Sequence, residues 1–171
     1  RLVTIGAVLL GLGAGAVAVL GPLVLGVIDY HVSDDLRNQI IGGDIAGLAL
    51  DAPTCIAAGL LTWRHHPVGR ALVLGPAFYA MYMYTQLAVG GDTARYDGNS
   101  TRFVPLFVTL FVLAGSIVYG VIQSSARGGL RVHAGRITRA FGWFAIVVAL
   151  FLAGGLHAPG LADAWRANPV G

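Results

Sequence analysis

The chain has 171 residues, of which 56% are hydrophobic and only 11% are charged. Soluble domains carry about a quarter charged residues, so this composition excludes a water-soluble globular domain. The net charge of +3 comes from arginines in short segments between apolar runs, without a basic face interleaved with aromatic residues, which excludes a nucleic-acid-binding protein. The basic residues are all arginine and the acidic ones all aspartate, and Ala, Gly and Val are abundant, which together indicate a GC-rich bacterial genome.

The apolar residues come in runs of about 20, the length that crosses the ~30 Å hydrocarbon core of a bilayer as a helix. We therefore predict an all-α integral membrane bundle of about five transmembrane helices in a single domain. The predicted spans are residues 2–28, 40–63, 71–89, 103–123 and 141–156.

The first run is too long for a signal-peptide core, so we predict a retained span. Gly11 and Gly15 form a small-xxx-small pair, which lets another helix approach closely. The Gly21-Pro22 pair allows a kink within this span.

Arginine placement predicts the orientation. With the N-terminus inside, the inner segments hold seven arginines and the outer segments four, which favours N-in and C-out. The inner ones are Arg1, Arg64, Arg70, Arg127, Arg131, Arg136 and Arg139, and the outer ones are Arg37, Arg95, Arg102 and Arg166. We predict a multi-pass protein of the bacterial cytoplasmic (inner) membrane.

The second run carries two aspartates at membrane depth after a polar segment, residues 29–39. Asp51 lies near the middle of the span, and Asp44 lies two helical turns earlier on the same face. A charge at this depth costs a few kcal/mol, and such residues usually face the bundle interior. Pro53 frees a backbone carbonyl near Asp51, as in sites that hold ions or polar substrates. Asp51 is predicted to be either a ligand-binding residue or a protonated acid that joins two helices.

The third run supplies partners for these acids. Tyr79, Tyr82 and Gln86 recur at helical spacing, whereas Tyr84 is predicted to point the other way. Pro67 in the short basic turn ends the second helix, so the second and third spans should be antiparallel neighbours. We predict that Tyr79 and Tyr82 contact Asp51 and that Gln86 lies near Asp44.

Other chemistry has little support in the sequence. His31 and His157 are both in outer segments, where aspartates could lie near them, but no zinc-protease spacing or Cys/His cluster is present. We therefore expect no metal and no cofactor. Ser116 has no local motif of a nucleophile. We therefore lean against an enzyme.

The stretch from Asp44 to Leu106 resembles a group of uncharacterised bacterial polytopic membrane proteins. The resemblance is carried by Asp51-Ala-Pro53, by Tyr79-Ala-Met-Tyr82 and by the polar loop from Asn99 to Phe107. It implies an acidic, proline-containing helix followed by a tyrosine-rich helix, and it implies no particular activity.

Three functions remain open. The first is a protein that binds a small-molecule or lipid ligand, or a proton, at the Asp51, Asp44, Tyr79, Tyr82 and Gln86 site. The second is an accessory subunit of a larger cell-envelope complex for lipid transport or respiration. The third is a membrane-embedded lipid-modifying enzyme. The expected partners are membrane lipids, further copies of the chain or a larger membrane complex.

Overall fold

The computed structural model describes residues 2–128 and 143, and residues 2–128 form helices joined by loops, with no strand among them. Four stretches in this part of the chain are helical, long and apolar enough to cross a membrane: Leu2–Leu20, Asp34–Trp63, Val68–Val89 and Ser100–Ser125. They confirm an all-helical protein with helices of transmembrane length. The fifth predicted span, residues 141–156, lies outside the described residues apart from residue 143.

The first helix, α1 (Leu2–Leu20), is shorter than the predicted span of residues 2–28. It ends where Gly21 donates its amide to the carbonyl of Val17 at 2.8 Å, and Pro22 follows without an amide hydrogen. The chain then turns through Gly26, whose φ is 60°, a left-handed value that suits glycine. The Gly21-Pro22 pair therefore ends the helix rather than kinking it.

The second span consists of α2 (Asp34–Ala46), the π-helical turn η1 (Gly47–Asp51) and α3 (Ala52–Trp63) in one continuous helical stretch. It begins earlier than the predicted residue 40, because Ser33 caps it by accepting a hydrogen bond from the Leu36 amide at 3.4 Å. Aspartates in the first turn also favour a helix start. The prediction of a loop extending to residue 39 is therefore wrong.

The third span consists of α4 (Pro67–Leu72) and α5 (Leu74–Val89), and it starts before the predicted residue 71 because proline suits the first turn of a helix. The fourth consists of the 3-10 turn η2 (Ser100–Phe103) and α6 (Val104–Gly128). It also extends beyond the predicted range of 103–123 at both ends.

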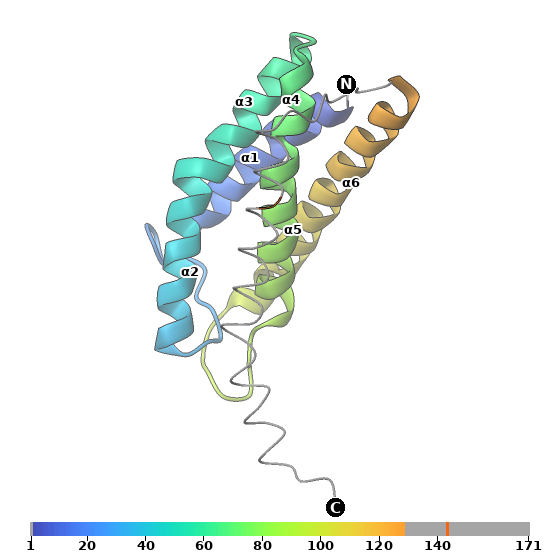
Figure 1. Cartoon of the computed structure of the whole chain (residues 1–171). Helices are drawn as coiled ribbons and strands as arrows, with labels where there is room; N and C mark the ends of the chain where they lie inside the picture. The colour runs from blue at the N-terminus through green and yellow to red at the C-terminus, as the bar shows by residue number, and fades with distance from the viewer. Residues whose placement is uncertain (1, 129–142, 144–171) are drawn as a thin grey trace, which may run out of the picture. The chain divides into compact units, whose positions relative to one another are not determined.

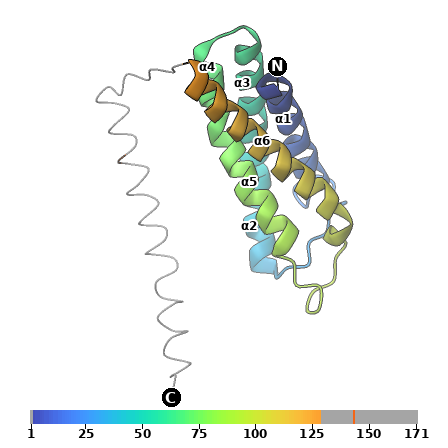
Figure 2. The same ribbon diagram turned by 90° about the vertical axis from the view of Figure 1, so that its right-hand side faces the viewer.

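The four spans run alternately up and down (Figures 1 and 2). The start of α1, the α3–α4 turn and the end of α6 lie at one end of this unit, and the loops after α1 and α5 lie at the other. The closest packing is between α1 and α3 and between α5 and α6, and α1 also packs on α6. Leu10, Phe107 and Ile117 are fully buried between these helices.

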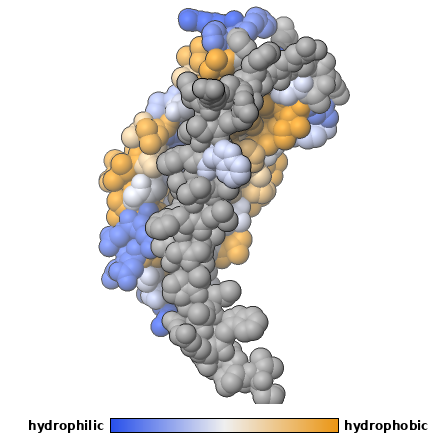
Figure 3. Space-filling view, in the orientation of Figure 1, coloured by the Kyte–Doolittle hydropathy of each residue, from blue (hydrophilic) through white to orange (hydrophobic). Residues whose placement is uncertain are grey.

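Hydrophobic side chains cover much of the middle of the visible helices, and hydrophilic ones gather at the α3–α4 turn and near the start of α2 (Figure 3). Leu50, Phe78 and Val112 are apolar and more than half exposed. An apolar waist between polar ends is the surface that a bilayer requires. The surface therefore agrees with the length and composition of the helices.

Candidate functional site

Both aspartates of the second span are buried on one face of it. Asp44 of α2 is 5% exposed, and Asp51, the last residue of η1, is 6% exposed. They line the same small cavity, of about 20 Å³, between α1, the second span and α5. The predicted acidic stripe is therefore confirmed, and the cavity between the two carboxylates has room for about one water molecule.

The backbone between the two acids departs from α-helical geometry. The Ala52 amide donates to the carbonyl of Gly47, five residues earlier, which defines the widened turn η1. Pro53 follows directly, and a proline ring clashes with the carbonyl four residues before it in a regular helix. A widened turn relieves such a clash. Single π-turns of this kind are frequent at functional sites.

Asp44 lies against the end of α1. A Cβ atom on Gly21 would come within 2.6 Å of the Asp44 Oδ2 atom, so a larger residue at this position would displace the carboxylate. The same Oδ2 atom is buried and has no hydrogen-bond partner among the described residues. An unpartnered buried carboxylate oxygen is costly, so its presence points to a proton or a ligand on that atom.

The third span meets these acids with a different face from the predicted one. Tyr79 lines the cavity with both aspartates, but its hydroxyl donates to the Gly43 carbonyl at 3.1 Å. Tyr82 is 60% exposed and does not line that cavity. Tyr84, predicted to point away, is only 5% exposed and lines it. The predicted contact of Tyr82 with Asp51 is therefore wrong, and Tyr84 takes that place.

The reason is that α5 is oriented by α6 rather than by the second span. Tyr84 stacks on Phe107 of α6 with ring centroids 6.2 Å apart. Ala77 and Ala80 are buried on the same side of α5. The signal in the sequence is the helical spacing of Ala77, Ala80 and Tyr84, which places two small residues and one aromatic ring on the face that packs on α6.

A groove adjoins the acid cavity on the side between the second span and α5. Its volume is about 300 Å³, and Asp51 and Tyr79 line both the groove and the acid cavity. The other residues that line it are mostly small or apolar: Ala46, Leu50, Thr54, Gly75 and Pro76. Asp51 thus places one carboxylate at an otherwise apolar groove halfway along the span.

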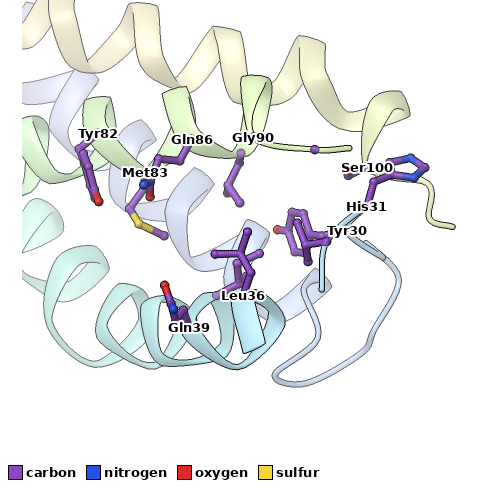
Figure 4. A pocket seen from close by; sticks show the side chains of 13 residues that line it. Tyr30, His31, Leu36, Gln39, Tyr82, Met83, Gln86, Gly90 and Ser100 are labelled. Atoms are coloured by element: carbon purple, nitrogen blue, oxygen red, sulfur yellow. The ribbon is translucent and has the colours of Figure 1, made fainter. Parts of the chain in front are cut away.

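A second cavity, which we call the outer cavity, has a volume of about 290 Å³ and lies at the loop end of α2 and α5 (Figure 4). Gln86 and Tyr82 line it, together with Gln39 of α2. Gln86 was predicted to lie near Asp44, but the acid cavity does not include it. Met83 and Leu87 line both cavities and stand between them.

The two loops at this end are bound together around Asn99. Its side chain accepts from the Asp29 amide at 2.9 Å and donates to the Val27 carbonyl at 2.9 Å. Nearby, the His31 ring nitrogen Nδ1 lies 2.9 Å from the Tyr96 carbonyl, so Nδ1 carries the hydrogen in this contact. We call this set of hydrogen bonds the loop clasp. It fixes the position of Tyr30, which lies between Asp29 and His31.

The remaining kinds of candidate site are a metal site and a nucleophilic side chain. Among residues 2–128, no three His, Cys, Asp or Glu side chains cluster closely enough to hold a metal ion. Cys55 is fully buried beside Gly11, and the Ser116 hydroxyl donates to the Val112 carbonyl at 2.8 Å within α6. Neither side chain is arranged as a nucleophile with a base.

Comparison of the chain with protein-family models, with curated proteins and with solved structures gives no match.

Proposed function

We propose that this chain is a multi-pass protein of the bacterial cytoplasmic membrane that binds a small-molecule or lipid ligand, or a proton, at Asp44 and Asp51. One observation carries the proposal: a buried Asp44 oxygen without a partner lines a cavity that it shares with a second buried carboxylate. Ionisable residues inside a membrane are costly and mark ligand and proton pathways. The widened turn η1 beside them adds to this argument.

The size of the cavities narrows the choice of ligand. The acid cavity of about 20 Å³ accepts a proton, a water molecule or a single donor group, and nothing larger. A larger ligand therefore keeps its body in the apolar groove and reaches Asp51 with a hydrogen-bond donor or a cationic group. This description fits an amphipathic molecule that enters from the lipid phase.

Labelling with dicyclohexylcarbodiimide tests the proton at this site, because the reagent is apolar and adds to protonated carboxyl groups. We expect one adduct, which peptide mass spectrometry places on Asp51, because Asp51 also lines the groove that has room for the reagent. Asp34 and Asp35, which are exposed at the start of α2, are internal controls and should stay unlabelled. Asp44→Asn and Asp51→Asn then show which carboxyl group reacts.

Native mass spectrometry of the protein extracted in mild detergent tests the ligand. We expect a retained mass on the unaltered chain that Asp51→Asn loses. Absence of any adduct on both acids, together with absence of a retained molecule, would contradict the proposal.

The accessory-subunit alternative is favoured by one surface. Leu2, Ile5, Leu9 and Leu12 form an exposed apolar ridge along α1, with exposed fractions of 51–61%. Such a ridge suits a neighbouring helix as well as lipid. Purification in mild detergent separates the two functions: a single monodisperse species argues against a subunit, and stoichiometric partner chains argue for one.

A further inference from the structure

The outer cavity has a chemical character different from that of the acid cavity. Its walls are the polar side chains of Tyr30, Gln39 and Gln86 and the apolar side chains of Leu36, Met83 and Leu87, among others. No Asp, Glu, Lys or Arg lines it, and the ionisable side chains that do line it are His31, Tyr30 and Tyr82. A volume of about 290 Å³ is at the lower end of the range that holds small molecules. The cavity therefore suits an uncharged molecule of modest size.

Tyr30 supplies the observation that points to a ligand. The residue is 5% exposed, and its hydroxyl is buried without a hydrogen-bond partner among the described residues. In Figure 4 this hydroxyl points into the space between Gln86 on α5 and Gln39 on α2. A buried hydroxyl without a partner costs free energy that a bound acceptor or donor would restore.

The fold holds this hydroxyl in place. The Tyr30 ring stacks on Phe107, with centroids 6.3 Å apart, and the loop clasp fixes the residues on either side of it. Burial, and to a lesser degree the charge of Asp44, raises the pKa of the Tyr30 phenol, so it stays neutral and keeps its hydrogen to donate. The group is preorganised for an oxygen acceptor.

We infer that the outer cavity binds a small uncharged ring that carries hydroxyl or carbonyl oxygens, of the phenol or quinone type. The two glutamine amides lie on opposite walls and can each donate or accept, so they suit oxygens on both edges of a ring. Met83 adapts to flat aromatic surfaces, and Leu36 and Leu87 cover the faces. The site is distinct from the acid pair and does not depend on the function proposed for it.

Equilibrium dialysis with three matched probes tests the inference. The protein in lipid nanodiscs is dialysed against 2-naphthol, naphthalene or 2-naphthoate, and empty nanodiscs are used to subtract partition into lipid. We expect saturable binding of one 2-naphthol per chain, about tenfold weaker or undetectable saturable binding of naphthalene, which lacks the oxygen, and no saturable binding of the anion.

Variants locate the binding. Tyr30→Phe keeps the stacked ring and removes only the hydroxyl, and we expect 2-naphthol to bind about 5–10-fold more weakly. Gln86→Leu should weaken it similarly. Tyr119→Phe and Gln123→Leu on α6, whose residues do not line the outer cavity, are the matched controls and should bind as the unaltered chain does.

Equal binding of naphthalene and 2-naphthol, binding of 2-naphthoate as tight as that of 2-naphthol, or unchanged affinity in both Tyr30→Phe and Gln86→Leu would overturn the inference. So would partition without saturation. Unfolding temperatures of the variants verify that any loss is not a loss of fold. The carbodiimide reactivity of Asp44 and Asp51 is measured separately, so failure here and failure at the acid pair are distinguishable.

Discussion

The two halves of the second span differ in how they meet their neighbours. In the α3 half, glycines bring the helix against α1: a Cβ atom on Gly11 would lie 2.8 Å from the Ala52 carbonyl oxygen, and one on Gly59 would lie 3.0 Å from the Thr4 carbonyl oxygen. In the α2 half, the seam with α5 contains the acid cavity and borders the outer cavity. One half is closed by backbone contact and the other is held open around polar groups. The division falls at η1: the α3 half packs closely on α1, and the α2 half contains the cavities.

The largest effect is expected from filling the closed half. Gly11→Ala should lower the free energy of unfolding by about 1–3 kcal/mol, because the new methyl group meets the backbone of α3. Gly42→Ala, on the exposed side of α2 with open space around it, should raise it by about 0.5–1 kcal/mol. Thermal unfolding in detergent measures both. If both substitutions changed the free energy of unfolding in the same direction, the contrast between the closed and the open half would be contradicted.

Two features that depend on one helix alone were predicted well from the sequence. The small-xxx-small pair in the first run indicated a close helix contact, and Gly11 makes one. Aspartates two turns apart had to share a face, and Asp44 and Asp51 do. These inferences depend only on the periodicity within one helix, which the chain fixes locally.

The faces that helices present to one another were harder to predict. Tyr82 was expected to face Asp51, yet α5 is turned by its packing on α6, and Tyr84 faces the cavity instead. Tyr30 was missed because it lies in a loop. Contacts with residues far away in the sequence hold it at the cavity: the stacking on Phe107 and the hydrogen bonds of Asn99, which lies 70 residues from Asp29. Such contacts depend on tertiary packing, which has no local period.

The open half depends on the loop clasp for its outer wall. Asn99→Ala removes both side-chain hydrogen bonds, to the Asp29 amide and the Val27 carbonyl, and should cost about 1–2 kcal/mol of stability. Limited proteolysis should cleave the loop after α1 faster, and 2-naphthol binding should weaken as Tyr30 loses its position. Asn99→Asp keeps the acceptor for the Asp29 amide, so its stability and its cleavage rate should lie between those of the unaltered chain and of Asn99→Ala. An unchanged cleavage rate in Asn99→Ala would show that the clasp does not hold the loops.

A smaller effect is expected where α5 touches α2. Tyr79→Phe removes the hydrogen bond to the Gly43 carbonyl and should lower stability by about 1 kcal/mol. Tyr82→Phe alters a hydroxyl on a residue that is 60% exposed and should leave the unfolding temperature unchanged. If Tyr82→Phe destabilised the protein more than Tyr79→Phe, the orientation of α5 described above would be wrong.

The smallest effect on stability is expected at the acids themselves. Asn has nearly the same shape as Asp and no charge, so Asp44→Asn should leave the free energy of unfolding within about 1 kcal/mol of the original value, or raise it. An acid that served only to join two helices would behave differently, because removing one partner of a buried hydrogen bond costs about 1–3 kcal/mol. The same measurement on Asp51→Asn tests the second carboxylate of the same cavity. Unchanged stability in both variants would show that neither aspartate is needed to join the helices. A loss of stability as large as that of Gly11→Ala would instead mark the open half as a second structural seam.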